Sequence, residues 1–355
     1  MEVWKMIVET ITDRNVLSSI TSTVFIILLG FYYRKNGTFG ETVSKILSSI
    51  VLKVAVPALA FTAFMKDIDP ETLQNSMGTL VWGILIYIIL IFLTPLFYLR
   101  YEGDRKTTLT VLSIFGSTTF FGIPIINSVF GAEGTIYANV FNIGYRIFLY
   151  SYAYIMMSGL KFEKKNLKQI FGNIIIIATF LGLFIWIFQG SLPQVAVTDP
   201  TTGKVASYAF LRIDKTAYWL YRPLHYLAGL ASPLAWLSIG AQLGSLNIKE
   251  AMSSRVSWYY AFVKVIIVPI INLAGILILN ATGLFGIFPL SYVAVGATMI
   301  MMATPTATVA AAYAISFDKD ATLASNASLL STVGAVIMIP IWIVVLQVLA
   351  NLAII

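Results

Sequence analysis

The chain lacks the residue types from which most metal and redox sites are built. Its 355 residues include no cysteine and a single histidine, His225. The absence of cysteine excludes disulfides, iron–sulfur clusters and thiol catalysis, and one histidine excludes the usual histidine-rich metal sites. Charged residues are also scarce, at 11% of the chain against about 25% in a typical soluble domain. We therefore expect no metal, no cofactor and no soluble fold.

The remainder of the sequence is strongly apolar. Hydrophobic residues make up 58% of the chain, and the mean hydropathy is +0.86. These values are typical of an all-α polytopic membrane protein. The formal net charge of +7 does not indicate nucleic-acid binding, because lysine and arginine lie between apolar runs, where they act as topology signals. The lipid bilayer is an expected partner, and nucleic acid is not.

Ten apolar runs approach the roughly 20 residues that a membrane-spanning helix needs. The predicted spans cover residues 16–33, 44–65, 77–99, 107–130, 135–160, 172–189, 219–246, 256–280, 289–315 and 322–352. A longer connection, residues 190–217, contains Pro193 and Pro200 and interrupts this series. It divides the chain into residues 1–189 and 218–355, with five spans in each half.

Lysine and arginine are unevenly distributed between the two sides of these spans. Twelve lie in one set of alternate loops: Arg34, Lys35, Arg100, Arg105, Lys106, Lys161, Lys164, Lys165, Lys168, Lys249, Arg255 and Lys319. Six lie in the other set: Lys5, Arg14, Lys66, Lys204, Arg212 and Lys215. Since positive residues favour the cytoplasm, both termini and the 190–217 linker are predicted to lie outside the cell membrane. The odd number of spans per half then inserts the second half inverted relative to the first.

Matching prolines in the two halves support an inverted five-plus-five repeat. Pro57 in span two corresponds to Pro233 in span seven. Pro95 in span three corresponds to Pro269 in span eight. Proline is common in membrane helices, so one matching pair carries little information. The two pairs are informative because they occur together and in the same order in both halves. They predict that spans four and nine occupy equivalent places.

Spans four and nine both contain an interruption rich in hydroxyl side chains. Residues 116–120 read Gly-Ser-Thr-Thr-Phe, and residues 305–309 read Pro-Thr-Ala-Thr-Val. A broken membrane helix is tolerated only where it is buried in protein or lines a cavity, and paired breaks are typical of a transporter's binding site. An alternative alignment pairs Pro124 with Pro305. We prefer the first alignment, because its hydroxyl residues coincide.

Arg146 is the one charged residue predicted near the bilayer midplane, in span five. Burying an arginine there costs a few kcal/mol or more, so the side chain must face a polar cavity, an anion or backbone carbonyls. Asn142 lies one turn away on the same helix face. No aspartate or glutamate falls inside a span, so the sign of the charge favours an anionic substrate. The alternative is that Arg146 only braces the broken backbone.

The interruptions offer groups that complement an anion. Half-helix amino termini present unpaired N–H groups and a partial positive charge, which suit a carboxylate. Hydroxyls at both breaks can donate and accept: Ser117, Thr118, Thr119, Thr304, Thr306 and Thr308. Alternatively, these hydroxyls only cap the interrupted helices. Lys53 and Lys264, deeper in their spans than other lysines, are expected either to snorkel to the membrane surface or to be structural lysines of the scaffold. The alternative is that they contact the substrate.

Three passages resemble the auxin efflux carrier family, which includes bacterial malate permeases and the plant PIN carriers. Span two contains residues 57–61 (Pro-Ala-Leu-Ala-Phe), and span seven contains residues 233–235 (Pro-Leu-Ala) followed by Gly240 and Leu243. Spans nine and ten, from Pro305 to Ile341, are similar to the family's C-terminal signature. The resemblance extends over all ten spans.

The resemblance implies a specific architecture and class of substrate. Spans one, two, six and seven would form a scaffold through which relatives form homodimers. Spans three to five and eight to ten would form a moving transport domain, with the broken spans four and nine crossing. The implied substrates are organic anions. Ser117 stands where the family usually has asparagine, and Thr306 where PIN carriers often have an amide, so specificity is expected to differ.

These observations predict a secondary carrier, not an enzyme, for small organic anions such as malate or other carboxylates. Alternating access would come from movement of the transport domain against the scaffold. The predicted substrate-binding residues are Ser117, Thr118, Thr119, Asn142, Arg146, Pro305, Thr306 and Thr308. A sodium-coupled symporter is the alternative within transport, and proton coupling is also open. A membrane sensor or intramembrane enzyme is less favoured, because neither a metal cluster nor a nucleophile–base pair is visible.

Overall fold

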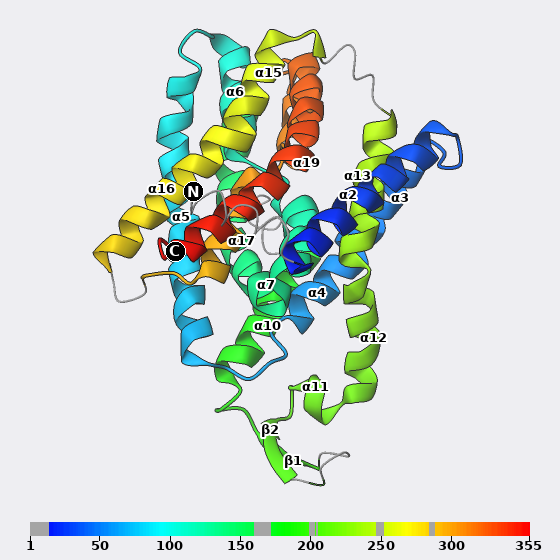
Figure 1. Cartoon of the computed structure of the whole chain (residues 1–355), viewed down its shortest axis with the longest axis vertical. Coiled ribbons are helices and arrows are strands. Elements are labelled where there is room, and N and C mark those ends of the chain that lie inside the picture. Colours follow the sequence, from blue (N-terminus) through cyan, green and yellow to red (C-terminus); the bar gives the residue numbers. More distant parts are fainter. Residues whose placement is uncertain (1–13, 160–171, 199–202, 204, 246–251, 284–287) are drawn as a thin grey trace.

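The structure, a computed structural model, describes residues 14–159, 172–198, 203, 205–245, 252–283 and 288–355, most of which are helical. Helices run roughly along one long axis, and a small β-hairpin projects from one end (Figure 1). Seven of the lysines assigned to loops lie outside the described residues: Lys5, Lys161, Lys164, Lys165, Lys168, Lys204 and Lys249.

The first half of the chain is helical throughout its described part. Its elements are α2 (Arg14–Lys35), α3 (Val43–Ile50), the π-helical turn η1 (Val51–Ala55), α4 (Val56–Thr62), α5 (Pro70–Phe97), α6 (Gly103–Ile114), the π-helical turn η2 (Thr118–Gly122), α7 (Ile123–Phe148), the π-helical turn η3 (Leu149–Ala153), α8 (Tyr154–Ser158) and α10 (Ile174–Phe188). Within α7, Gly131 has φ 61° and breaks the helical backbone. This positive φ suits glycine, and it separates the two segments that were predicted as spans four and five.

The second half begins with the hairpin and then returns to helices. Its elements are β1 (Gln194–Thr198), β2 (Val205–Ala209), α11 (Ile213–Thr216), α12 (Tyr218–Gly229), α13 (Ala231–Ser245), α15 (Arg255–Phe262), the π-helical turn η4 (Val263–Ile267), α16 (Val268–Thr282), α17 (Tyr292–Ala303), α18 (Thr308–Ser316) and α19 (Ala321–Asn351). The two strands are antiparallel, with Gln194 opposite Ala209 and Thr198 opposite Val205. The segment predicted as a linker therefore contains an ordered hairpin.

Five helical stretches in the described chain are long and apolar enough to cross a membrane. They are Val43–Thr62, Pro70–Phe97, Tyr218–Ser245, Arg255–Thr282 and Ala321–Asn351. Shorter apolar helices are Ile174–Phe188 and Tyr292–Ala303. At 1.5 Å per residue, the 12 residues of α6 or of α17 are too short to span a hydrocarbon core of about 30 Å alone. The protein is thus a multi-pass membrane protein, and α6 and α17 are shorter than a full span.

The helices fall into two groups that pack mainly within themselves. One group contains α2, α3, α4, α10, α12 and α13, and the other contains α5, α6, α7 and α15 to α19. Figure 1 shows α2, α3 and α13 on one side of the molecule and α5, α6, α15 and α16 on the other, with α7 and α17 between them. In the first group α2 lies very close to α13, because neither Gly30 nor Gly240 leaves room for a Cβ atom against the opposite backbone.

A buried arginine anchors the chain beside the hairpin. Arg212 is 1% exposed and donates to both carboxylate oxygens of Asp214, at 2.8 and 2.9 Å. It also donates to Asp67, at 2.9 Å, and to Gln189 Oε1, at 2.6 Å. Since Asp67 lies in the loop between α4 and α5, and Gln189 ends α10, this cluster ties three segments together.

Candidate functional site

Two interruptions meet near the centre of the molecule. Gly116 and Thr306 form an antiparallel β-bridge. The N–H of Ser117 donates to the carbonyl of Pro305 at 2.7 Å, and the N–H of Ala307 donates to the carbonyl of Phe115 at 2.9 Å. Backbone groups left unpaired where α6 and α17 stop therefore find partners in each other, as a buried break requires. We call this paired region, residues 115–117 and 304–307, the crossing.

Local sequence explains why the second interruption occurs where it does. Thr304, with φ −65° and ψ 150°, is extended at the end of α17. The residue before a proline is disfavoured in the α region, and Pro305 itself has no N–H to donate. The chain becomes helical again at Thr308, the first residue of α18.

Thr306 is held by protein groups on the far side of the crossing. Its hydroxyl lies 2.7 Å from the hydroxyl of Tyr260 and 2.8 Å from that of Ser331. Its N–H donates to Ser331 Oγ at 3.2 Å. Thr306 is 6% exposed and Pro305 is also buried. The structure therefore gives these two predicted site residues a role in joining the crossing to α15 and α19.

A second group of predicted residues gathers around Arg146. The Arg146 guanidinium donates to Thr119 Oγ1 at 3.0 Å, and Asn142 Nδ2 approaches the same oxygen at 3.5 Å. Arg146 and Asn142 are both buried, at 5% and 4% exposure. Among the ion pairs of the described chain, none involves Arg146. The segment η2, directly after the first break, thus contacts a buried cation that has no carboxylate partner.

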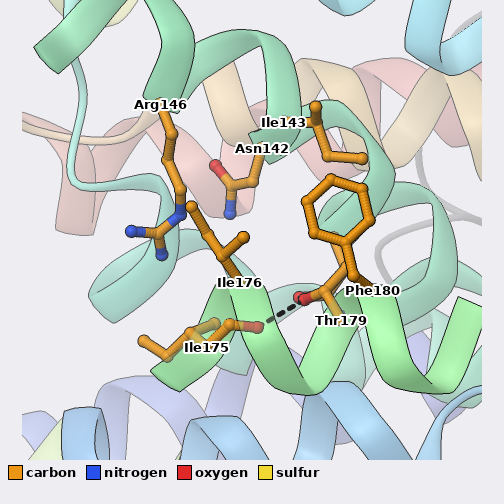
Figure 2. Close-up of a pocket in the computed structure, with 8 residues that line it drawn as sticks. Asn142, Ile143, Arg146, Ile175, Ile176, Thr179 and Phe180 are labelled. Atoms are coloured by element: carbon orange, nitrogen blue, oxygen red, sulfur yellow. Dashed lines mark hydrogen bonds between the residues drawn. The ribbon is translucent and has the colours of Figure 1, made fainter. Parts of the chain in front are cut away.

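Arg146 and Asn142 line a pocket between α7 and α10. The lining residues are Asn139, Asn142, Ile143 and Arg146 from α7, and Ile175, Ile176, Thr179 and Phe180 from α10. Figure 2 shows Arg146 and Asn142 extending from α7 toward α10, with Ile143 and Phe180 farther along the pocket. Asn142 Oδ1 is buried without a hydrogen-bond partner among the described residues. The pocket therefore combines a cation, amides and an apolar wall.

The other predicted residues lie away from this pocket. Ser117 is partly buried and Thr118 is buried at the start of η2, whereas Thr308 is exposed on α18. None of these three lines the pocket. Of the eight predicted residues, the structure brings Asn142 and Arg146 into the pocket wall and places Thr119 in hydrogen-bond contact with them.

The residues contributed by α10 were missed in the sequence. They belong to an apolar run, residues 174–188, that carries no signal of a site beyond one buried hydroxyl, Thr179. Asn139 could have been found, because positions 139, 142 and 146 share one face of a helix. Its partner across the pocket is Thr179, at 3.5 Å.

Of the interpretations left open for Lys264, snorkelling to the membrane surface is wrong. Lys264 is 0% exposed, and its ammonium donates to the carbonyl of Ser113 at 3.0 Å. Its helix face turns toward the end of α6, so the side chain points into the protein. Lys53, by contrast, is exposed.

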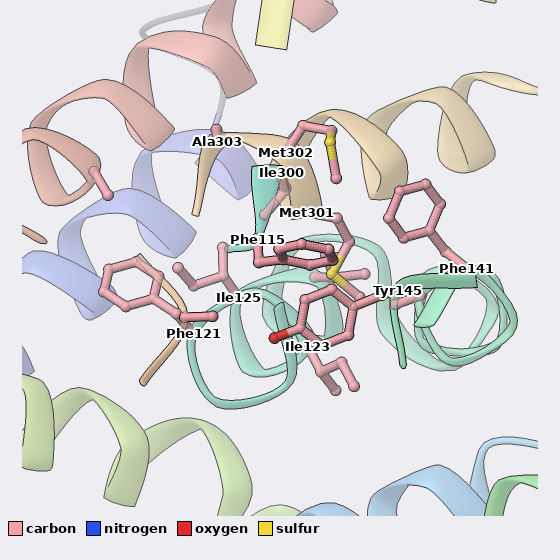
Figure 3. Close-up of a cluster of buried hydrophobic side chains, with 14 of the residues drawn as sticks. Phe115, Phe121, Ile123, Ile125, Phe141, Tyr145, Ile300, Met301, Met302 and Ala303 are labelled. Carbon is pink, nitrogen blue, oxygen red and sulfur yellow. The ribbon is translucent and has the colours of Figure 1, made fainter. Parts of the chain in front are cut away.

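Apolar and aromatic side chains enclose the crossing. Phe115 stacks on Tyr87, with ring centroids 5.7 Å apart, and packs against Tyr145 at 6.1 Å. Figure 3 shows Phe115 and Tyr145 together with Met301 in this buried cluster. All of these side chains are at most 5% exposed. Because such a surrounding has a low dielectric constant, it strengthens electrostatic interactions at the crossing.

Comparison with known proteins agrees with this architecture. Residues 15–174 match the model of the family described as Membrane transport protein. The matched segment is somewhat less than half of the chain. The match also agrees with the resemblance to the auxin efflux carriers.

Two relatives of the chain are named as transporters. An uncharacterized transporter of Methanothermobacter thermautotrophicus is 22% identical over 335 residues, which cover 92% of this chain and 97% of the relative. An uncharacterized transporter of Methanocaldococcus jannaschii is 21% identical over 235 residues, covering 64% of this chain and 68% of the relative. The protein is therefore a membrane transporter, and neither name specifies a substrate.

Proposed function

We propose that the protein is a secondary carrier for small organic anions. The observation that carries the proposal is Arg146, a buried cation in a pocket wall with no carboxylate partner among the described residues. A buried charge is costly unless it is paired. An anion in the pocket would supply the missing partner, and an arginine fork suits a carboxylate well.

The shape of the pocket favours a compact anion with one carboxylate. Arg146 is the one charged residue in its lining, and four of the eight lining side chains are isoleucine or phenylalanine. A second carboxylate, as in malate, would meet apolar side chains instead of a cation, and burying it unpaired would be costly. We therefore expect a small monocarboxylate with an apolar body to bind better than malate.

The transport mechanism we propose is alternating access between two rigid parts. Ten spans would form an inverted five-plus-five repeat, residues 1–189 and 218–355, with broken spans four and nine meeting at the crossing. Spans one, two, six and seven would form the scaffold, and the remaining spans would form the transport domain. Since the pocket lies between α7 and α10, movement of one part against the other would change its walls. This placement supports a pocket that opens to each side in turn.

Uptake into proteoliposomes tests the proposal. We expect labelled isovalerate, a compact monocarboxylate, to accumulate in vesicles with wild type, and Arg146→Met to reduce the rate at least hundredfold. Lys53→Met, which removes an exposed lysine, is the matched control and should transport normally. Equal rates for Arg146→Met and wild type would remove the proposed site. Replacing sodium with choline, or collapsing a proton gradient, then identifies the coupling ion.

The proposal also includes the orientation of the chain in the membrane and its oligomeric state. We expect both termini outside the cell membrane and a homodimer formed through the scaffold. Because the chain contains no cysteine, single cysteines placed at Gly37 and Gly203 can be labelled without background. An impermeant maleimide added to intact cells should label position 203 and not position 37. The reverse pattern would contradict the predicted orientation.

A further inference from the structure

Lys264 occupies an unusual place for a lysine, beside the crossing. It lies in η4 and is fully buried, and its ammonium donates to Ser113 in the last turn of α6. A Cβ atom added to Gly116 would come within 3.2 Å of the same ammonium. The Lys264 ammonium therefore contacts the carboxyl end of α6 and lies beside the first residue of the β-bridge.

No acidic side chain balances this charge in the described chain. Three charged residues are buried there, namely Arg146, Arg212 and Lys264, and carboxylates pair with Arg212 alone. Thr304 Oγ1 lies beside the same added Cβ atom at Gly116, and its hydroxyl donates to the carbonyl of Met301. What faces the ammonium is the negative end of the α6 dipole.

Capping the helix does not require a charge at this position. Tyr260, on the same face of the helix, donates to the neighbouring carbonyl of Leu112 at 2.9 Å. A neutral donor therefore serves the adjacent carbonyl in the same environment. Unlike the Tyr260 hydroxyl, the Lys264 amine can take up a further proton and so carry a positive charge beside the end of α6.

We propose that Lys264 sets the electrostatic potential of the anion site from the opposite side of the crossing. Its ammonium cancels the negative carboxyl end of α6, while the amino end of the helix that starts at η2 remains positive toward Thr119 and Arg146. Lys264 is thus a second cation that raises anion affinity without lining the pocket. This inference rests on the proposed function, since it assigns a further specificity-determining residue to the same anion.

Titration calorimetry on the purified full chain tests this role, with isovalerate as the probe. Lys264→Gln keeps a donor for Ser113 but removes the charge, and Lys264→Met removes both. We expect both variants to bind isovalerate about tenfold more weakly or worse, the scale of a Coulomb interaction through a protein interior. Their melting temperatures should equal or exceed that of wild type. In uptake assays, KM should rise while the maximal rate stays unchanged.

Three other outcomes would each contradict the inference or the proposed site. Wild-type affinity in Lys264→Gln would show that Lys264 only caps α6 and would overturn the inference. A lower melting temperature together with lost binding in both variants would assign Lys264 to folding and would overturn it too. Arg146→Met, measured in parallel, should lose binding in either case. If wild type itself binds no isovalerate, the proposed monocarboxylate site fails, and the inference fails with it.

Discussion

Two regions of the molecule bury basic side chains, but they surround them with opposite kinds of groups. Beside the hairpin, Arg212 is surrounded by acceptors: both oxygens of Asp214, one of Asp67 and the amide oxygen of Gln189. At the crossing, Arg146 and Lys264 are equally buried but contact a hydroxyl and a carbonyl, with no carboxylate among the described residues. In the first region, carboxylates of the protein balance the charge of Arg212. In the second region, no described carboxylate balances the charge of Arg146 or Lys264.

The charge state of Arg212 shows how pairing changes the energetics. Burial alone would lower its pKa, but hydrogen bonds and Coulomb attraction to Asp214 and Asp67 outweigh burial, and the pKa of Arg212 lies above its ordinary value. A cation paired in this way stabilises the fold. An unpaired buried cation costs stability, and such costs are tolerated where function needs them. The comparison therefore supports the proposal that Arg212 is structural and that Arg146 and Lys264 serve transport.

Replacing Arg212 should produce the largest loss of stability. Arg212→Met leaves Asp214, whose side chain is only 10% exposed, without its partner, which we expect to cost about 3 kcal/mol. Thermal unfolding in detergent measures the loss. Asp67→Asn is the control, because Asp67 is 76% exposed and an exposed pair contributes at most about 1 kcal/mol. Equal effects of the two substitutions would contradict the view that burial makes the Arg212 cluster structural.

Removing the Thr306 hydroxyl should have an intermediate effect. Thr306→Val preserves shape but loses contacts with Tyr260 and Ser331, which keep other acceptors at Leu112 and Ser328. We expect a loss of about 1 kcal/mol in stability and a changed maximal transport rate with little change in anion affinity. Stability and the affinity for isovalerate are the measurements. A large loss of affinity at unchanged stability would instead place Thr306 in contact with the substrate.

The smallest effect concerns the helix cap at Asp69. Its carboxylate accepts from the N–H of Thr72 at 2.7 Å at the start of α5. Partial burial raises its pKa, but the bonds to Thr72 and attraction to Lys66 outweigh burial, so the net pKa is below 3.8. Its stabilisation is therefore present above pH 4 and is lost as the pH falls through the folded-state pKa. Asp69→Ala should cost about 0.5 kcal/mol at pH 7, the low end for a helix cap, because the Asp69 side chain is 47% exposed.

The pH dependence of the same variant provides the control. As the pH falls below 4 and through the lowered pKa, wild type and Asp69→Ala should converge in melting temperature, because the protonated carboxyl no longer benefits from the cap. A difference that persists unchanged at acid pH would show that the charge of Asp69 does not matter.

Local features of the structure could be predicted from the sequence. The end of α17 follows from Pro305, whose ring disfavours helix in the residue before it. Arg146 and Asn142 share a face because they are four residues apart. The absence of buried acidic residues in the described chain follows from their positions in loops or near span ends. Each of these inferences depends on residues close together in the chain.

Features that depend on distant packing could not be predicted. The burial of Lys264 beside α6 was not specified, since depth along a helix does not reveal which neighbour its face meets. The resemblance implied that the two breaks cross, but not the register that pairs Gly116 with Thr306, 190 positions apart. The wall supplied by α10 comes from an apolar run without polar marks. The hairpin of β1 and β2 lies in a segment whose prolines and glycine indicated only a loop.

The most direct test of the account is the affinity of wild type and Arg146→Met for isovalerate, measured by calorimetry alongside their melting temperatures. The account predicts that Arg146→Met binds at least a hundredfold more weakly yet melts no lower than wild type, because an unpaired buried charge has been removed. Unchanged affinity, or a melting temperature that falls as it does for Arg212→Met, would contradict the claim that the unpaired cation serves an anion.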